Sequence, residues 1–234
     1  MLSLPALALW MEAQDLFGPE GIYDNADLEG IAWERPAAAH WLEPEGEGFA
    51  VDCGIRVQGG SSTGNWKVPK VSLRLLFKRD YGPGTLDFPV FGEGVDRFNT
   101  LVLDAHMNNT WIHPGAGQQA RGQYVRDPFM ADLQRAVGGH APRTRFANVF
   151  LNGAYWGVFA VHERPDDAWA AELFGGERED YDVLRHSASN VVSGDADSWN
   201  EVLSLVRAGA EDEQVLPVRS AIVAEQLLGR GYVD

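Results

Sequence analysis

The residues best suited to chemistry are basic side chains gathered around a glycine- and serine-rich stretch between Cys53 and Arg79. These bases are Arg56, Lys67, Lys70, Arg74, Lys78 and Arg79, and no Asp or Glu stands among them. The whole chain of 234 residues has a net charge of −15, so this stretch reverses the sign of the charge locally. Cationic groups beside a loop rich in backbone N–H groups are typical of phosphate sites. The stretch therefore predicts an anion-binding site, most simply for phosphate.

Two strands are expected to position these bases. In Phe49–Gln58 apolar residues occupy the odd positions, which is the alternation of a strand buried on one face. A second alternating run covers residues 70–78, and the turn-forming residues 59–65 join the two. A plain hairpin with a solvated basic face explains the same pattern. The residues alone leave both interpretations open.

Composition narrows the class of protein. Apolar residues make up 45% of the chain, which is typical of a globular protein. The negative charge argues against nucleic acid as a partner. Cys53 is the one cysteine, which excludes an internal disulfide and a multi-cysteine zinc site. Residues 1–14 begin with an apolar run that is too short to span a bilayer, and they lack a basic segment. They predict an early strand, with no signal peptide and no membrane span in the chain.

The remaining pattern predicts an α+β protein. Residues 15–48 are punctuated by Gly and Pro and predict an ordered loop. Asn152-Gly153 lies between two apolar runs and predicts a hairpin over residues 146–162. A strand is predicted at Phe98–Leu103, and helices at Val125–Val137, Asp166–Phe174, Ser198–Ala208 and Glu213–Leu228. Asp127-Pro128 is expected to cap and begin the first of these helices.

Two weaker patterns have open alternatives. The loop at residues 106–122 contains His106 and His113 with two asparagines, which permits metal binding but offers no third ligand at a fixed spacing. Asp195 and Asp197 have the spacing of an acidic pair, whereas the glycine and serine beside them favour a helix cap. No metal ligand is assigned from these patterns.

With these segments in place, the chain resembles the CotH kinase family, named for a bacterial spore-coat protein. The matching segments run in order through most of the chain. They are Gly54–Ser62, Pro69–Lys78, Tyr81-Gly82, Phe98–Leu103, Tyr124–Asp127, Phe150–Val158, Glu163–Asp166 and Asp180–Val183. The resemblance implies a divergent protein-kinase-like fold and the transfer of phosphate from ATP to protein side chains.

The resemblance also implies a domain organisation. Residues 1–48 would be an N-terminal extension packed on the domain, and residues 49–163 a kinase-like small lobe with a twisted antiparallel sheet and one inserted helix. In that lobe, Val71–Lys78 would be the third strand and Val125–Val137 the inserted helix. Residues 164–234 would be the linker and the incomplete beginning of a helical large lobe.

Lys70 would then be the phosphate-binding lysine, and the Gly59–Ser62 loop would cover the phosphates. Arg74 would lie about 13 Å further along the same strand face, and Glu163 would accept a hydrogen bond from adenine or ribose. The full set of expected cofactor-binding residues is Arg56, Gln58, Gly59, Gly60, Ser61, Ser62, Lys70, Arg74 and Glu163. The implied cofactors are ATP and magnesium, and the partners are the nucleotide and a protein substrate whose identity the sequence does not give.

The chain departs from the family pattern at several points. Leu103-Asp104-Ala105 stands where family members usually carry Leu-Arg-Ala. The catalytic and metal-binding acids of the family follow the helical region, so they are expected beyond Asp234, and no catalytic residue is assigned within the chain. A fragment of this kind is expected to be inactive alone and to self-associate through helical residues that would face the missing lobe, namely Val215, Ile222, Leu227 and Leu228.

A non-catalytic alternative remains beside the kinase interpretation. The chain could be a binding or structural module of a secreted or coat protein, with a basic groove that holds an anionic partner. A bacterial cell-surface or secreted location is compatible with either interpretation, and the sequence does not decide it.

Overall fold

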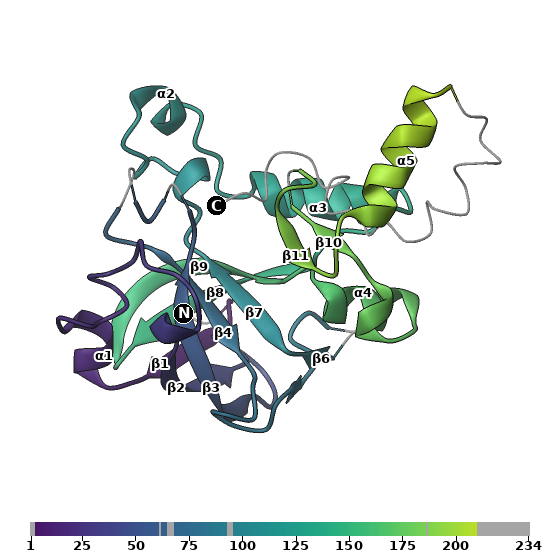
Figure 1. Cartoon of the computed structure of the whole chain (residues 1–234). Coiled ribbons are helices and arrows are strands. Elements are labelled where there is room, and N and C mark those ends of the chain that lie inside the picture. The colour runs from purple at the N-terminus through teal and green to yellow at the C-terminus, as the bar shows by residue number, and fades with distance from the viewer. Residues whose placement is uncertain (1–2, 61, 65–67, 93–95, 186, 210–234) are drawn as a thin grey trace. The chain divides into compact units, whose positions relative to one another are not determined.

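The computed structural model is α+β, with more strand than helix (Figure 1). It describes residues 3–60, 62–64, 68–92, 96–185 and 187–209. These residues fall into two compact units that divide between Glu163 and Arg164. No helix in the described ranges is long and apolar enough to cross a membrane.

The first unit holds most of the strands. They are β1 (Ala6–Trp10), β2 (Arg35–Leu42), β3 (Phe49–Gln58), β4 (Ser72–Leu76), β5 (Leu86–Asp87), β6 (Arg97–Phe98), β7 (Thr100–Asp104), β8 (Thr144–Leu151) and β9 (Ala154–Glu163). Its helices are α1 (Ala13–Phe17), α2 (Ala116–Gln119), α3 (Arg126–Ala136) and the single-turn helices η1 (Ile31–Trp33) and η2 (Met107–Asn109). β3 has the bounds that the alternating pattern predicted.

The larger strands close into a barrel in the order β1-β2-β3-β4-β7-β9-β8. Neighbouring strands are antiparallel except for β1 and β8, which run parallel and complete the ring. The expected twisted antiparallel sheet is therefore a closed barrel with one parallel pair. Closure leaves the barrel strands without an exposed edge.

The first 48 residues contribute to this barrel as well. They supply β1, which was predicted as an early strand, and β2, which lies in the segment predicted as an ordered loop. β2 pairs with β3 along its length, from Arg35 opposite Ile55 to Trp41 opposite Phe49. The expected domain boundary at residue 48 thus falls within an antiparallel strand pair.

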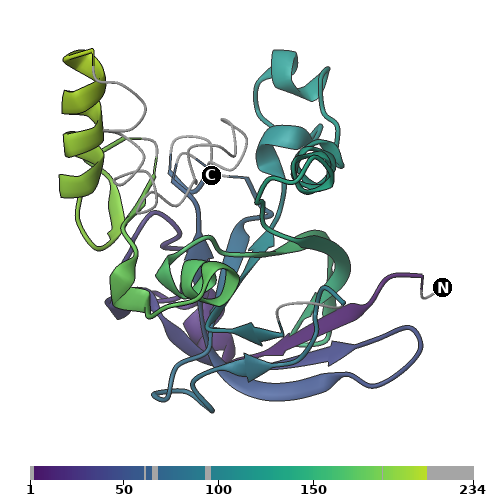
Figure 2. The same cartoon turned by 90° about the vertical axis from the view of Figure 1, so that its right-hand side faces the viewer.

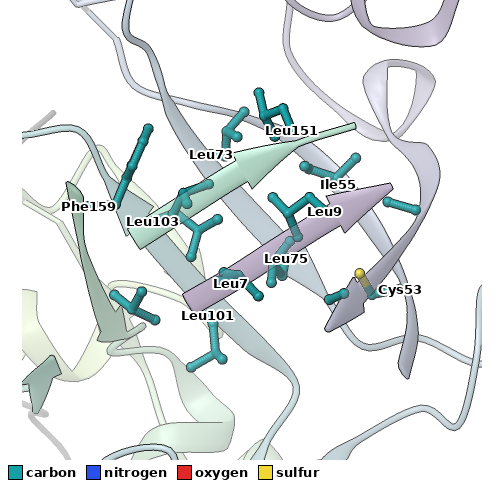
Figure 3. Packing of buried hydrophobic residues seen from close by; sticks show 14 of the residues in the cluster. Leu7, Leu9, Cys53, Ile55, Leu73, Leu75, Leu101, Leu103, Leu151 and Phe159 are labelled. Atoms are coloured by element: carbon teal, nitrogen blue, oxygen red, sulfur yellow. The ribbon is translucent and has the colours of Figure 1, made fainter. Parts of the chain in front are cut away.

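The barrel interior is filled by aliphatic side chains (Figure 3). Alternation sends the apolar positions of each strand inward, and Cys53 and Ile55 of β3 are fully buried there. The inward set includes Leu7, Leu9, Leu73, Leu75, Leu101, Leu103, Leu151 and Phe159. These side chains come from strands around the barrel. The pairing of β1 with β8 closes the ring and so encloses the core. Burial raises the pKa of Cys53 to about 12, as expected for a core thiol.

The predicted hairpin is confirmed as β8 and β9. Asn152 and Gly153 form its tip with φ of 49° and 83°, the positive values that a type I′ turn requires. The Asn152 side chain also accepts a hydrogen bond from the Met11 N–H and donates one to the Met11 carbonyl, both at 2.9 Å. The turn residue thereby fixes the end of β1 beside β8.

Helix α3 confirms the first predicted helix but not its cap. It begins at Arg126, so Asp127 lies in the first turn and does not cap the helix. Its apolar residues Phe129 and Leu133 are 62% and 45% exposed, whereas Ala131 is buried. α2 and α3 lie on the same side of the barrel (Figures 1 and 2).

The second unit contains α4 (Asp167–Phe174), η3 (Arg178–Asp180), β10 (Val183–Leu184), β11 (Val191–Ser193) and α5 (Asp197–Arg207). α4 and α5 confirm two predicted helices. Asp166 caps α4 by accepting the Trp169 N–H at 3.1 Å. The predicted helix at residues 213–228, with its apolar residues, lies outside the described residues.

Candidate functional site

Lys70 lies two residues before β4, where its ammonium reaches across to β9. The Nζ atom donates a hydrogen bond to the Val158 carbonyl at 2.5 Å and another to the Tyr124 hydroxyl at 3.0 Å. It also lies 4.2 Å from the centroid of the Phe159 ring. The prediction that Lys70 opens the strand is therefore corrected, because β4 begins at Ser72. The lysine is instead held from outside the strand by β9 and Tyr124.

The backbone around Lys70 is fixed by Tyr23, a residue of the segment predicted as an ordered loop. The Tyr23 hydroxyl donates to the Pro69 carbonyl and accepts from the Val71 N–H at 3.4 Å. It also accepts from the Trp156 ring N–H at 3.3 Å. Both residues next to Lys70 are thus bonded to the same hydroxyl, which in turn contacts β9.

A bulge in β9 makes room for the lysine. The register between β8 and β9 shifts at this point: Val149 pairs with Gly157 and Phe150 with Tyr155, so Trp156 is the extra residue. Gly157 has φ of 116°, and a Cβ placed on it would lie 3.4 Å from the Lys70 Cε. A glycine inside a strand often marks such a close approach, and that signal was present in the sequence.

Burial and one carboxylate set the charge state of Lys70. Burial lowers the pKa of Lys70 to about 8, while the negative charge of Asp104 acts in the opposite direction. Asp104 ends β7, and its Oδ1 accepts hydrogen bonds from the Ser72 hydroxyl at 3.1 Å and the His106 N–H at 2.7 Å. Asp104, which stands where the family resemblance implies an arginine, thus favours the charged form of the candidate lysine.

Tyr124 is supported by a buried aromatic neighbour, His106. The His106 ring lies 4.9 Å from the Tyr124 ring, and its side chain is almost fully buried. His106 has left-handed backbone angles, φ 57° and ψ 38°, which are uncommon for a residue with a side chain. Within the described part of the chain neither ring nitrogen has a hydrogen-bond partner, and Asp104 Oδ2 lies 3.9 Å from Nδ1. In the sequence, His106 stood out only as a possible metal ligand.

The Gly59–Ser62 loop is compact. Gly59 has φ of 148°, and a Cβ there would lie 2.4 Å from the Ser62 Oγ atom. The Gly60 carbonyl accepts a hydrogen bond from the Thr63 hydroxyl at 2.9 Å. The Ser62 hydroxyl is buried and has no hydrogen-bond partner among the described residues. Ser61 lies outside those residues.

Arg74 and Gln58 lie together on the outer face of the barrel. Their strands pair in register, and the Arg74 Nε donates to the Gln58 Oε1 at 2.8 Å, with Nη2 bonding the same oxygen. Arg74 is buried. These two expected site residues therefore contact each other, and Lys70 bonds to a different set of groups.

Arg56 and Glu163 are engaged in ion pairs. Glu34 is buried, and its carboxylate lies 2.8 Å from Lys78 Nζ and 3.5 Å from Arg56 Nη1. The Glu163 carboxylate accepts from the Arg143 side chain at 2.9 Å and from the Arg143 N–H at 2.6 Å. Arg56 and Lys78, two of the six bases that predicted the anion site, thus face the carboxylate of Glu34.

The acidic pair Asp195 and Asp197 and the loop histidine His113 form hydrogen bonds with nearby residues of the chain. Asp195 Oδ1 accepts the Asp197 N–H at 2.8 Å beside the start of α5, but Ala196 holds the N-cap position and no side chain caps the helix there, so the helix-cap interpretation is not confirmed. His113 Nδ1 accepts the Gly115 N–H at 2.9 Å. Among the residues that the structure describes, no group of three or more His, Cys, Asp or Glu side chains is arranged to hold a metal ion.

Comparison with known protein families shows which family the chain belongs to. A family model described as "CotH kinase protein" matches residues 55–215, more than half of the chain. The chain belongs to the CotH kinase family. No curated protein matches it. The match begins inside β3, so the CotH region includes the Gly59–Ser62 loop, Lys70, Asp104, Tyr124 and the β8–β9 hairpin.

Proposed function

We propose that this CotH-family chain provides ATP and phosphate binding for phosphoryl transfer to protein side chains, and that Lys70 is the principal phosphate ligand. The observation that carries the proposal is the placement of the Lys70 ammonium on neutral oxygens. An ammonium has three N–H donors. Val158 and Tyr124 accept two of them, and the Phe159 ring lies 4.2 Å from Nζ. The described residues supply no third oxygen or nitrogen acceptor, and a phosphate oxygen would be such an acceptor.

Features of the Gly59–Ser62 loop support the same ligand. Its buried Ser62 hydroxyl has no partner in the described part of the chain, and a phosphate oxygen would supply one. Gly59 leaves only enough room for that hydroxyl, because a Cβ would clash with it. When bound, ATP supplies the transferable phosphoryl group. Lys70 and Ser62 would hold its phosphates, and the proposal assigns no magnesium ligand within the described residues.

The kinase-like small-lobe interpretation is kept with one change of strand. A kinase small lobe carries a helix between its third and fourth strands. In this chain α3 follows β7 and precedes β8, and β7 lies between β4 and β9 in the barrel. β7 therefore fits the third-strand position better than β4. Lys70 reaches the site from the start of the neighbouring strand.

The alternative function is a non-catalytic module with a basic anion-binding groove. The position of Glu34 argues against it. That buried carboxylate already faces Arg56 and Lys78, so the groove is partly neutralised by the chain itself. A polyanion held by a continuous basic surface should bind without magnesium and without nucleotide selectivity. A nucleotide site centred on Lys70 should bind ATP more tightly than inorganic phosphate.

Titration of the chain with ATP, with and without magnesium, tests the proposal through a matched pair of lysine variants. Lys70→Ala removes a charge-assisted hydrogen bond of about 1.5–3 kcal/mol, so ATP affinity should fall roughly 10- to 100-fold. Lys67→Ala, whose position lies outside the described residues, should change it little. Equal losses in the two variants would reject Lys70 as the principal ligand, and equal binding of ATP and pyrophosphate would favour the alternative.

A transfer assay addresses catalysis separately. Phosphoryl transfer by kinases depends on a catalytic Asp and on carboxylate-held metal ions. None of those groups is assigned to a residue of the 234-residue chain, so this chain incubated with labelled ATP and magnesium should show no transfer that depends on Lys70. Transfer abolished by Lys70→Ala would show that the catalytic acids lie within the chain, and Asp180, Asp182, Asp195 and Asp197 would be the first to substitute.

A further inference from the structure

We propose that Tyr124 is a positioning residue that holds the Lys70 ammonium against β9 and leaves one of its N–H groups for an oxyanion of the ligand. This inference deepens the proposed function and rests on it for the identity of the ligand. The placement of Lys70 by Tyr124 can be tested without any ligand.

The three groups form a closed triangle of hydrogen bonds. Lys70 Nζ donates to the Tyr124 hydroxyl and to the Val158 carbonyl, and the Tyr124 hydroxyl donates to the same carbonyl. The pairing of β7 with β9 begins at Ala160, so the Val158 carbonyl lies beyond the part of β9 that β7 covers. Without the tyrosine the ammonium would keep one acceptor and could rotate about it.

Tyr124 is itself held in place by aromatic neighbours. Its ring lies 4.9 Å from His106 and 5.7 Å from Phe146, measured between ring centroids. Burial, followed by the charge of Asp104, raises the pKa of the Tyr124 phenol well above its usual range. The hydroxyl is therefore protonated at neutral pH and donates to the Val158 carbonyl.

The charged and titratable groups around the triangle come from three elements. β7 contributes Asp104, the segment after it contributes His106, and β9 contributes Tyr155, which acts on the Tyr124 phenol. Asp104 stabilises the ammonium form of Lys70, and Tyr124 does the same by accepting its hydrogen bond. Removing the Tyr124 hydroxyl should therefore make Lys70 lose its proton at lower pH.

The chain is well suited to a direct measurement because it contains three lysines, Lys67, Lys70 and Lys78. With carbon-13-labelled lysine, the Cε signals can be followed by NMR across a pH titration and assigned with single Lys→Arg variants. In the unaltered protein, Lys70 should titrate near pH 8. A midpoint below the ordinary lysine value of about 10.4 would support an ammonium buried against β9 beside Val158 and Phe159.

Tyr124→Phe is the decisive variant, and Tyr155→Phe is its control. Tyr155 lies on β9 too, but its hydroxyl bonds to Asn148 and does not touch Lys70. Loss of a hydrogen bond to a charged group should lower the Lys70 titration midpoint by about one pH unit in Tyr124→Phe. The midpoint should stay unchanged in Tyr155→Phe. An unchanged midpoint in Tyr124→Phe, or equal shifts in both variants, would overturn the proposal.

ATP binding provides a second readout that separates the two proposals. Tyr124→Phe should weaken ATP binding about 10-fold, with no loss in Tyr155→Phe, because the ammonium is no longer fixed. If neither the unaltered chain nor the variants bind ATP, the proposed function fails, and the NMR titration still decides whether Tyr124 positions Lys70. If ATP binds and Tyr124→Phe leaves both affinity and midpoint unchanged, the positioning role fails alone.

Discussion

Gly157→Ala tests the central geometric statement about the site, that the Lys70 side chain packs on the bulge of β9. The added methyl would lie 3.4 Å from the Lys70 Cε and 3.7 Å from Nζ, which is ordinary contact distance. The lysine would keep its position but lose water from one side. Further desolvation disfavours the ammonium, so the pKa of Lys70 should fall below its value of about 8.

The same change also strains the backbone. Gly157 has φ of 116°, outside the left-handed region that a residue with a side chain can adopt, so the strain costs on the order of 1–3 kcal/mol. Replacing glycine also removes freedom from the unfolded chain, which offsets about 0.4–1 kcal/mol. The net loss in the free energy of unfolding should therefore be about 1 kcal/mol. This is small enough for the variant to remain folded and for its lysine signals to be measured.

Gly46→Ala is the matched control, since Gly46 has φ of 114° and nothing within 4 Å of its added Cβ. Chemical denaturation should show similar destabilisation in both variants. Titration of the lysine Cε signals should show a lowered Lys70 midpoint in Gly157→Ala alone. Equal midpoints in the two variants would refute the packing of Lys70 on the bulge, and an undiminished stability of Gly157→Ala would refute the bulge conformation itself.

Two further outcomes are expected. ATP affinity should fall about tenfold between pH 7 and pH 9, because the phosphate needs the ammonium and Lys70 loses its proton as the pH rises through its pKa of about 8. Isothermal titration calorimetry measures this fall. An equal fall in Lys70→Arg, whose guanidinium stays charged, would contradict the prediction. Gly153→Val should lower the unfolding free energy by at least about 1 kcal/mol, since φ of 83° at the hairpin tip is unfavourable for a β-branched residue. Gly117→Val, at an open position without positive φ, is the control, and equal stabilities would contradict the hairpin assignment.

Local patterns in the sequence predicted those elements whose residues carry their own signal. β3 alternates without interruption, and its bounds were predicted to the residue. Asn152-Gly153 specified the β8–β9 hairpin through turn chemistry alone. β2 was missed because its sequence contains Pro36 and three consecutive alanines, which are poor strand formers. It becomes a strand because β1 and β3 pair with both of its edges.

The candidate site around Lys70 was predictable only in part, because most of its contacts come from segments distant in the sequence. The sequence displays the basic run directly, and the family resemblance then singled out Lys70 within it. Its acceptor on β9 is the backbone carbonyl of Val158, and no side-chain pattern reveals a carbonyl. Tyr124 and Tyr23 come from segments 54 and 46 residues away, so their contacts with Lys70 and its neighbour Pro69 depend on the closed barrel. The strand glycine at position 157 was the one local signal of this arrangement.

The partners of the bases, rather than their number, decide where an anion can bind. Arg56 and Lys78 face the buried carboxylate of Glu34, and an incoming anion would have to displace that carboxylate from a buried position. Lys70 bonds to neutral oxygens, so a phosphate can share its ammonium without breaking an ion pair. Asp104 moderates the attraction because its charge acts on the same group. Under the proposed function, a phosphate is therefore expected at Lys70 rather than at Arg56 or Lys78, although the sequence shows a continuous basic run.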